Sequence, residues 1–409
     1  MANHRSIGEP IEFSMIAVDE DRPAARVFER LNEHVLTVAG VYGANASGKS
    51  NLLAALAWLA EAVDRSLRSW GDAVPREPFK FGDGPDRPTR FEVDMVVDGV
   101  RYSYQIELDD TCVLYEALHS YPKRQPRSLF EREDLNLSLR RGLGRLSGIR
   151  ELLTPTTLAL SAAMRFDEPE VRPFARALAG VGTLGVGRRR SSRSTARLLA
   201  SAAGLPLPDG FSAEAALELL RFADLGINDI DVTERQFVDA AGKPVVNRDG
   251  KAATQLQVRL VHQVGEQFVA FDSRDESDGT LAWFELIGPV LNALSTGQVL
   301  LFDEIDASLH PRLSAKLIEL FQDPVTNPAA AQLVFTTHDT SLLNHLNRDE
   351  VWLTEKGSSG ATTLTALAEF GGDKVRRSLN LERAYLQGRF GGVPEFDQQR
   401  LRRALGLVA

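Results

Sequence analysis

The sequence predicts an α/β protein with a mixed sheet flanked by helices, an antiparallel β subdomain and a mostly helical insertion. Three observations lead to this prediction. Residues 35–63 have the pattern of an apolar strand, a glycine-rich loop and a helix rich in Leu and Ala. A second apolar run, at 299–304, ends in two acids. Residues 91–108 alternate apolar and polar side chains around Asp98-Gly99, which is the strongest short-range hairpin signal.

The loop after the first strand carries Gly43-x4-Gly48-Lys49-Ser50, the complete pattern of a phosphate-binding P-loop. Glycines allow backbone conformations that a side chain would block, so the loop amides can point at phosphate oxygens beside a helix N-terminus. Lys49 is expected to reach the β- and γ-phosphates, and Ser50 to ligate Mg²⁺. A chance match is the alternative, against which the flanking strand and helix argue. The predicted nucleotide-binding residues are Gly43, Asn45, Ala46, Ser47, Gly48, Lys49, Ser50 and Asn51.

The composition excludes several classes of protein. The chain has 409 residues, 43% of them apolar and 25% charged, as in a globular protein of two or three domain-sized units. A net charge of −9 argues against a general nucleic-acid binder. A single cysteine, Cys112, excludes a disulfide framework and a cysteine-rich zinc site. No apolar run approaches the ~18 residues of a membrane span, and charged residues such as Arg5 and Glu9 interrupt any signal-peptide core. Cytoplasmic residence is therefore expected.

Residues 1–120 are expected to form the first lobe of the fold. Residues 3–17 predict a turn followed by a strand with period-two alternation. The P-loop strand and its helix come next, then the hairpin, and a third strand-like run at 112–118 extends the antiparallel sheet.

Residues 121–250 differ in character from the rest. They are richer in Arg, Pro and Gly and carry short amphipathic runs such as 214–223, so we expect a mostly helical insertion without a coiled coil. The one dense basic cluster, at 188–193, could contact a phosphate backbone. A solvated loop is the plainer interpretation, because Gly and Ser surround it.

Residues 251–409 are expected to complete the fold as its C-terminal lobe. The predicted elements are strands at 254–264, 267–271, 299–304 and 332–337, helices at 281–294 and 311–321, and two edge strands around a Gly-Ser turn within 351–366.

The apolar run Val299–Phe302 delivers Asp303 and Glu304 to the carboxyl edge of the predicted sheet, which is a Walker B pattern. Asp303 is expected to ligate Mg²⁺, and Glu304 to polarise the attacking water as the catalytic base. Charge at the end of an apolar strand is unfavourable unless it is paired. The structural alternative is a pair of acids that cap the next helix.

A further apolar strand ends at Thr336-Thr337-His338-Asp339, and His338 lies 35 residues after Asp303 (338 − 303). A histidine at that strand end can hydrogen-bond the γ-phosphate or the attacking water, which would make it a second catalytic residue. A lone histidine is commonly structural, but its position after the Walker B strand favours a function.

Ser277-Asp278-Gly279-Thr280 opens the helical run at 281–294, 26 residues before Asp303 (303 − 277). A Ser–Gly turn at a helix N-terminus can serve as a second anion site. Simple N-capping is the structural alternative.

Taken together, the stretches GANASGKSN, ESDGT, VLLFDEIDASLHP and TTHDTSLLN resemble the ABC-type ATPases of the SMC, RecF and OLD group. In that resemblance 277–280 corresponds to the ABC signature, 306–311 to the D-loop region and His338 to the switch histidine. The opening NHRS at 3–6 looks like the N-F-R-S turn of many of these proteins, with His4 in place of Phe.

A narrower resemblance covers nearly the whole chain. The stretches PFKF, VLYEAL, LFER, ADLGINDIDV and YLQGRFGGVP are similar to AAA-type ATPases of bacterial anti-phage and abortive-infection operons. One departure concerns the Q-loop: no glutamine lies at 78–81, where it is expected, and Lys80 could replace it. Long coiled-coil arms and a Cys-x-x-Cys hook are also absent from the sequence.

The resemblance implies a mechanism and partners. Two heads dimerise, or form a larger oligomer, around ATP and Mg²⁺, and the P-loop of one head faces Ser277, Asp278 and Gly279 of the other. The ATPase would act as sensor and scaffold of a defence system, triggered by DNA or a phage protein, with a separately encoded TOPRIM-type nuclease as effector. Only 71 residues follow His338 (409 − 338), so we expect no nuclease site in this chain.

Three other functions stay open at this point. A RecF-like DNA-repair ATPase would bind DNA in an ATP-dependent and salt-sensitive way. An ATP-gated interaction switch with negligible turnover would act through protein contacts alone. An ABC-transporter ATPase is more remote, because the sequence has no LSGGQ-like signature and the segment 121–250 fits such an ATPase poorly.

Overall fold

The computed structural model divides the chain into two compact units, which are described separately: Met1–Val181 with Val334–Ala409, and Gly182–Leu333. The P-loop pattern and His338 belong to the first unit, whereas the predicted signature and Walker B residues belong to the second. The structure describes residues 1–28, 33–123, 125–186, 213–223, 226–236, 254–307, 309–370, 380–392, 402–403 and 405. The basic cluster 188–193 lies outside these described residues.

An antiparallel sheet packed against a long helix forms much of the first unit. The strand order is β4-β5-β6-β7-β8, and every adjacent pair is antiparallel. Helix α1 (Lys49–Ser69) begins directly after the P-loop, as predicted. The strands are β4 (Thr89–Val97), β5 (Val100–Leu108), β6 (Val113–Tyr121), β7 (Arg127–Glu133) and β8 (Asn136–Leu139).

The predicted hairpin is confirmed. Val97 pairs with Val100, so Asp98 and Gly99 form a two-residue turn with φ values of 51° and 72°. Positive φ at both central residues is the requirement of a type I′ turn, which Asp-Gly meets readily. The predicted third strand is also present, and pairs with the second as β6.

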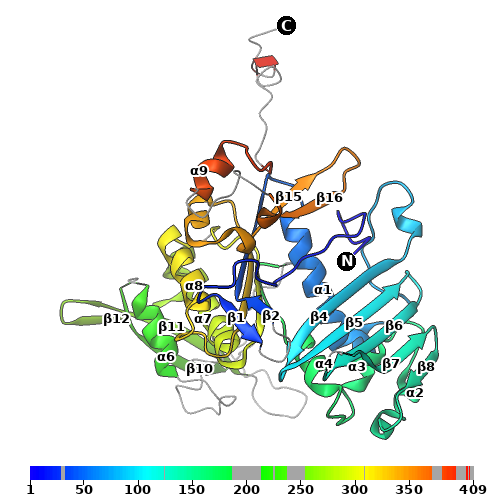
Figure 1. The fold of residues 1–409 in the computed structure, drawn as a ribbon. Helices are drawn as coiled ribbons and strands as arrows, with labels where there is room; N and C mark the ends of the chain where they lie inside the picture. The colour runs from blue at the N-terminus through cyan, green and yellow to red at the C-terminus, as the bar shows by residue number, and fades with distance from the viewer. Residues whose placement is uncertain are drawn as a thin grey trace. The chain divides into compact units, whose positions relative to one another are not determined.

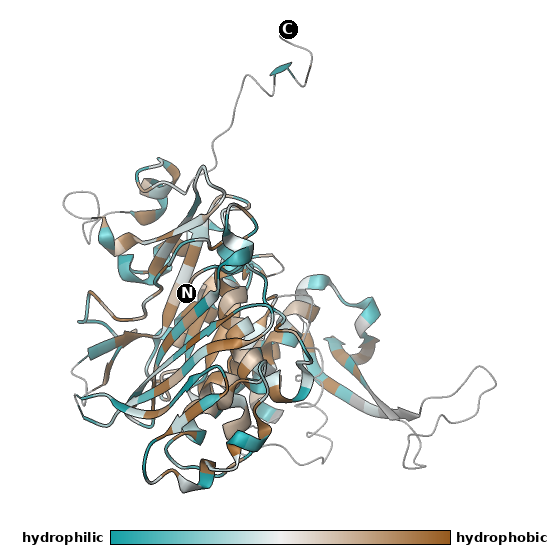
Figure 2. Cartoon of the chain, turned by 90° about the vertical axis from the view of Figure 1, so that its right-hand side faces the viewer, coloured by the Kyte–Doolittle hydropathy of each residue, from teal (hydrophilic) through white to brown (hydrophobic). Residues whose placement is uncertain are grey.

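One apolar core joins this sheet to the helices. Apolar and polar residues alternate along its strands (Figure 2), so that one face of the sheet is apolar. Leu59 and Val63 of α1 meet Tyr104 and Leu118 of the sheet in this core, each at most 2% exposed. Full burial of such a side chain stabilises the fold by about 1.5–3 kcal/mol. Three short helices beside the sheet contribute to the same core (Figure 1): α2 (Ile149–Leu152), α3 (Ala159–Ala163) and α4 (Arg172–Ala179).

A buried carboxylate fixes the start of α3. Glu116 is fully buried and accepts hydrogen bonds from the Tyr104 hydroxyl at 2.8 Å and from the amides of Ala159 at 2.6 Å and Leu160 at 2.8 Å. The buried guanidinium of Arg132 lies 3.7 Å from the Glu116 carboxylate. Burial raises the pKa of Glu116 while Arg132 opposes the rise. The pair therefore links β6 and β7 to the helical segment that follows them.

The P-loop strand lies inside a second sheet of this unit, in the order β16-β15-β3-β14. All six residues of β3 (Val38–Gly43) are buried, as predicted for a central strand. It pairs in parallel with β15 (Val351–Lys356), which pairs on its other side with β16 (Thr362–Ala366) in the antiparallel sense. The expectation of two edge strands within 351–366 is thus wrong for β15, which has a neighbour on both sides. β14 (Gln332–Thr336) ends in the first unit.

Two further expectations for the N-terminal part need correction. The predicted strand 35–42 is divided, because β2 (Glu33–Leu36) leaves the line of β3 and pairs with β1 (Ala25–Phe28). Residues 3–17 form the predicted turn but no continuous strand, only isolated bridges such as Ile16 to Val35. The remaining elements of this unit are α9 (Leu381–Leu386) and the 3₁₀ turns η1 (Gly84–Asp86), η2 (Gly144–Leu146), η4 (Thr340–His345), η5 (Arg348–Glu350) and η6 (Leu367–Glu369).

The second unit combines a parallel strand pair with helices and a separate antiparallel sheet. Strand β13 (Val299–Phe302) runs parallel to β9 (Gly182–Leu184). The Trp283 indole donates to the Leu219 carbonyl oxygen at 2.8 Å, which ties two of the helices together. The other elements are helices α6 (Ala213–Phe222), α7 (Asp278–Thr296) and α8 (Pro311–Gln322), the turn η3 (Ser273–Asp275), and a sheet of β10 (Ile227–Gln236), β11 (Thr254–Val264) and β12 (Gln267–Asp272).

The predicted division into residues 1–120, 121–250 and 251–409 stays a prediction. Within 121–250 the described elements include β7 to β10 as well as α2, α3, α4 and α6, so strands and helices both occur there. The predicted α/β class with a parallel-containing sheet and antiparallel sheets is confirmed. None of the described helices is both long and apolar enough to pass through a lipid bilayer.

Candidate functional site

The P-loop occupies the turn between β3 and α1, where both of its glycines are required. Gly43 ends the strand with φ +152°, and Gly48 precedes the helix with φ +111°. A Cβ on Gly43 would lie 2.4 Å from the Thr354 carbonyl oxygen, and one on Gly48 would lie 2.1 Å from Thr362 Oγ1. A side chain at either position would collide with the neighbouring strands, so the pattern predicted from sequence has a steric basis in this fold.

Lys49 lies inside the curve of the loop. Its side-chain Nζ donates to the carbonyl oxygens of Gly43 at 2.9 Å and Ala44 at 3.3 Å, and the residue is 5% exposed. Asn45 and Ala46, at the tip of the loop, are exposed. The loop thus presents backbone and a cation beside the N-terminus of a helix of 21 residues. That arrangement suits a phosphate chain, because a helix N-terminus carries partial positive charge and amide donors.

A chain of hydroxyl groups holds the loop from behind. Ser47 Oγ and Thr354 Oγ1 are 2.6 Å apart, and Thr362 Oγ1 donates to the Ser47 carbonyl oxygen at 2.8 Å. Ser6 Oγ lies 2.8 Å from Thr362 Oγ1 and accepts from the Asn51 side-chain amide at 2.6 Å. Sequence reasoning did not assign Ser6, Thr354 or Thr362 to the site. The NHRS opening was a signal for Ser6 only.

The opening turn also reaches the segment where a Q-loop glutamine was expected. Asn3 Oδ1 accepts from the Phe79 amide at 3.0 Å, and its amide nitrogen donates to the Gly84 carbonyl oxygen at 2.9 Å. The His4 ring lies against Trp58 and Phe91, at centroid distances of 6.1 Å and 5.5 Å, in the place that an aromatic Phe would fill. Lys80 is exposed. Its substitution for the glutamine stays a prediction.

His338 follows the strand next to the P-loop strand. The Thr337 amide donates to the Val41 carbonyl oxygen of β3 at 3.3 Å, so the chain leaves the sheet at the same edge as the P-loop. Thr337 Oγ1 accepts from the Asp339 amide at 3.0 Å, and Asp339 in turn caps η4 through the Ser341 amide at 2.9 Å. His338 itself is exposed. The prediction that His338 follows the end of an apolar strand is thus confirmed.

In the second unit, Asp303 and Glu304 follow the end of β13, as predicted. The Asp303 amide donates to the Leu184 carbonyl oxygen at 2.9 Å, which extends the pairing with β9 by one residue. Glu304 is exposed and has φ +55°, in the left-handed region. A non-glycine residue in that region carries about 1–2 kcal/mol of strain, and such strain is concentrated at functional sites.

The structural alternative for the two acids, a helix cap, is not what the fold contains. The next helix, α8, is capped by His310, whose Nδ1 accepts from the Arg312 amide at 3.2 Å. Ser314 of the same helix donates to the Ile305 carbonyl oxygen at 3.3 Å, which fixes the turn after the acids.

The predicted signature residues form the start of α7. Ser277 is the N-cap, and its Oγ accepts from the Thr280 amide at 3.1 Å, so the capping alternative is realised. Ser277 and Asp278 are nevertheless exposed. Just before them, Glu276 Oε1 lies 2.8 Å from His262 Nε2 of β11. A role of Ser277, Asp278 and Gly279 toward a second head stays a prediction.

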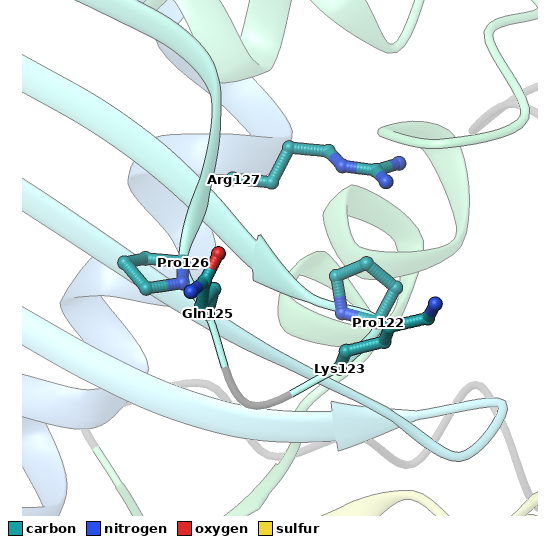
Figure 3. Close-up of a pocket in the computed structure, with 5 residues that line it drawn as sticks. All are labelled: Pro122, Lys123, Gln125, Pro126 and Arg127. Carbon is teal, nitrogen blue, oxygen red and sulfur yellow. The ribbon is translucent and has the colours of Figure 1, made fainter.

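A pocket lies elsewhere, on the turn that joins β6 to β7. It has a volume of about 490 Å³ and is lined by Pro122, Lys123, Gln125, Pro126 and Arg127 (Figure 3). None of the residues predicted from sequence lines it. It therefore does not bear on the phosphate-binding loop.

Comparison with models of known protein families identifies one family for this chain. A family model described as "AAA domain, putative AbiEii toxin, Type IV TA system" matches residues 38–344, a range that includes the P-loop pattern, the predicted signature and Walker B residues, and His338. No curated protein matches the sequence.

Several solved structures are similar to the chain at low identity. The SMC head domain from Thermotoga maritima has 12% identity and a TM-score of 0.33, covering 80% of this chain and 89% of its own. The transporter component cbiO1 from Clostridium perfringens has 10% identity and a TM-score of 0.31, covering 97% and 100%. An Smc head with coiled coil and joint from Pyrococcus yayanosii has 15% identity and a TM-score of 0.25, covering 43% and 28%. On the family match over 38–344, the chain belongs to this family of AAA domains.

Proposed function

We propose that the chain binds and hydrolyses ATP and that ATP joins two copies of it. The observation that supports this best is the placement of Lys49, whose Nζ lies within the loop at the N-terminus of α1. There the P-loop amides and Lys49 would hold the β- and γ-phosphates, with Ser47 fixed by Thr354 and Thr362 beneath them.

We propose that Ser50 and Asp303 would ligate a magnesium ion together with nucleotide phosphates. Ser50 is exposed on the first turn of α1, and Asp303 follows an apolar strand. One hydroxyl, one carboxylate and phosphate oxygens are the mixed ligand set that Mg²⁺ takes in nucleotide enzymes. Among the described residues no three His, Cys, Asp or Glu side chains gather into a metal site of their own. Bound Mg²⁺ would offset the charge of the phosphates.

Glu304 and His338 would act on the attacking water. Glu304, in its left-handed conformation, would accept the proton of that water, and His338 would hydrogen-bond the γ-phosphate or the water. Ser277, Asp278 and Gly279 of a second copy would close over the nucleotide, with the α7 N-terminus facing the γ-phosphate. ATP would then stabilise the dimer, and hydrolysis would release it.

A role in defence extends this proposal. The family description names a toxin–antitoxin system, which fits a chain that works with a second gene product. We propose that ATP-bound dimers, or larger oligomers, act as sensor and scaffold for a separately encoded TOPRIM-type nuclease, with DNA or a phage protein as trigger.

The experiment is mass photometry of the Glu304→Gln chain with and without ATP and Mg²⁺, with Lys49→Ala/Glu304→Gln as the control that cannot bind nucleotide. Dimers that form only with ATP, and only when Lys49 is present, would support the proposal. A second arm adds duplex DNA. Assembly that requires DNA would instead favour a repair-type clamp, and a Glu304→Gln chain that hydrolyses ATP at the wild-type rate would exclude Glu304 as the base.

A further inference from the structure

The C-terminal motif YLQGRFGG, residues 385–392, has no role in the function proposed above, yet it packs directly on the P-loop strand. The Tyr385 ring lies 6.1 Å from that of Tyr42, edge to face, and both residues are buried. Tyr42 immediately precedes Gly43. The helix α9, which carries Tyr385, is seen near β15 in Figure 1.

A hydrogen-bonded glycine pair continues this contact to the loop itself. The Gly392 amide donates to Glu355 Oε1 at 2.6 Å, and the Tyr385 hydroxyl donates to the Gly392 carbonyl oxygen at 2.8 Å. A Cβ placed on Gly392 would lie 3.7 Å from the Cα of Gly43. A side chain at position 392 would thus contact the first glycine of the P-loop, so the motif lies beside Gly43.

Gly43 has both Thr354 and Gly392 as neighbours. A Cβ on Gly43 would be 2.4 Å from the Thr354 carbonyl oxygen. Gly392 is the second neighbour, and its amide is held by the Glu355 carboxylate. Thr354 and Glu355 are consecutive residues of β15, so one strand end fixes both neighbours of Gly43.

The glycines of the motif differ in whether the contact with Glu355 leaves room for a side chain. Gly391 has φ +74°, and a Cβ on it would lie 2.1 Å from Glu355 Oε1. Gly388 has almost the same backbone, with φ +72°, but a Cβ there would meet nothing within 4 Å. The two positions share the conformational preference for glycine and differ in the collision with Glu355.

The same segment is also tied to the residues after His338. Glu382 of α9 accepts from the Asn344 side-chain amide at 2.7 Å and from the Thr340 hydroxyl at 3.4 Å, both in η4. One short stretch, 380–392, thus contacts the start of the P-loop and the turn that follows the switch histidine.

We propose that Glu355 and Tyr385 are positioning residues for the nucleotide, which seat the Gly391-Gly392 pair against Gly43 and so hold the P-loop in its binding conformation. The proposal rests on the ATP-binding function above, since it assigns these residues a part in that same site. A preformed loop binds more tightly because less ordering is required at the moment of binding.

The first test compares Glu355→Ala with Glu355→Gln in the full chain. Affinity for a fluorescent ATP analogue is measured, and amide hydrogen exchange of residues 42–50 is followed without nucleotide. Glu355→Ala should weaken binding about three- to tenfold, as expected for one lost hydrogen bond, and should speed exchange at 42–50. Glu355→Gln keeps an oxygen acceptor for the Gly392 amide and should restore both values. If Glu355 acted only through its negative charge, Glu355→Gln would not restore affinity or exchange, and the inference would be wrong.

The second test uses the two glycines. Gly391→Ala should weaken binding of the ATP analogue and speed amide exchange at 42–50 more than Gly388→Ala does. Adding Glu355→Ala to Gly391→Ala should cause little further loss of affinity, because the collision and the hydrogen bond belong to one contact. Equal exchange in Gly391→Ala and Gly388→Ala, or a rise that is not confined to 42–50, would overturn the inference. If the wild-type chain does not bind ATP, the proposed function is wrong. Amide exchange at 42–50 in the Gly391→Ala and Gly388→Ala variants still tests whether the glycine pair holds the loop.

Discussion

The side-chain nitrogen of Lys49 donates a hydrogen bond to the carbonyl oxygen of Gly43, 2.9 Å away. These two residues lie near the two ends of the P-loop pattern, so the cation closes the loop on itself in this structure. A phosphate chain would compete for the same charge. The nucleotide must therefore offer Lys49 more than a backbone carbonyl does, and a charge-assisted contact to phosphate meets that condition.

Lys49→Ala should weaken ATP binding by about tenfold to a hundredfold, because a hydrogen bond to a charged group contributes about 1.5–3 kcal/mol. Titration with a fluorescent ATP analogue measures the loss. Lys316→Ala is the matched control, since it removes the same charge from the exposed pair with Glu319 on α8. Wild-type affinity in Lys49→Ala would contradict the assignment of the loop as the phosphate site.

Glu304→Gly should leave the chain more stable than Glu304→Ala, by about 1 kcal/mol. Glu304 has φ +55°, a conformation that glycine adopts without the steric penalty of a Cβ. Thermal denaturation of both variants measures the difference, and both should lose ATP hydrolysis alike because neither has a carboxylate. A more stable Ala variant would mean that the backbone relaxes at residue 304.

Ser277 allows capping to be separated from a role in the dimer. Ser277→Asp should keep the melting temperature, because Asp also caps a helix well and can accept from the Thr280 amide. The same change should reduce ATP-dependent dimerisation, because it would place a negative charge beside the γ-phosphate of the other head. Ser277→Ala should lower the melting temperature, with about 1 kcal/mol lost at the cap.

Mass photometry in the Glu304→Gln background, with ATP and Mg²⁺, checks the dimerisation part of that prediction. Ser277→Asp dimers as abundant as those of the parent would show that Ser277 acts only as a cap.

His4 should make the stability depend on pH. Its ring is 1% exposed, neither ring nitrogen has a hydrogen-bond partner among the described residues, and burial lowers its pKa from 6.5 to about 4, with Arg5 adding to the shift. The unfolded chain therefore binds a proton below about pH 6.5 that the folded chain takes up only near pH 4. His4 should therefore leave the free energy of unfolding unchanged above pH 6.5. Below pH 6.5 the free energy of unfolding should fall progressively as the pH drops toward 4.

His4→Phe removes this titration and keeps an aromatic ring against Trp58 and Phe91. Chemical denaturation at pH 7.5 and pH 5 measures the effect. The variant should gain stability over the parent at pH 5 by about 2 kcal/mol more than it does at pH 7.5, given 1.36 kcal/mol per unit of pKa difference. Equal differences at the two pH values would show that His4 does not titrate in this range.

Local pattern was enough to predict the elements whose geometry depends on near neighbours. Asp98-Gly99 predicts its hairpin because two adjacent residues must take positive φ, and the P-loop pattern predicts its turn because Gly43 and Gly48 must do so. Periodicity likewise predicted β11, β12, α7 and α8 of the second unit, but not β9 and β10, which lie in the segment expected to be mostly helical. Residues 3–17 show where this reasoning fails: alternation describes one face of a strand, but a strand also needs a backbone partner, and alternation cannot supply it.

The sequence by itself therefore determined the P-loop, the Walker B acids and the strand-end position of His338, because each is written in consecutive residues. Tertiary structure decided what surrounds them. Thr354 and Gly392 lie more than 300 residues from Gly43 along the chain, and only the pairing of β15 with β3 brings them against it. The left-handed backbone of Glu304 was also not predictable from the sequence, because no local preference favours that conformation for a glutamate.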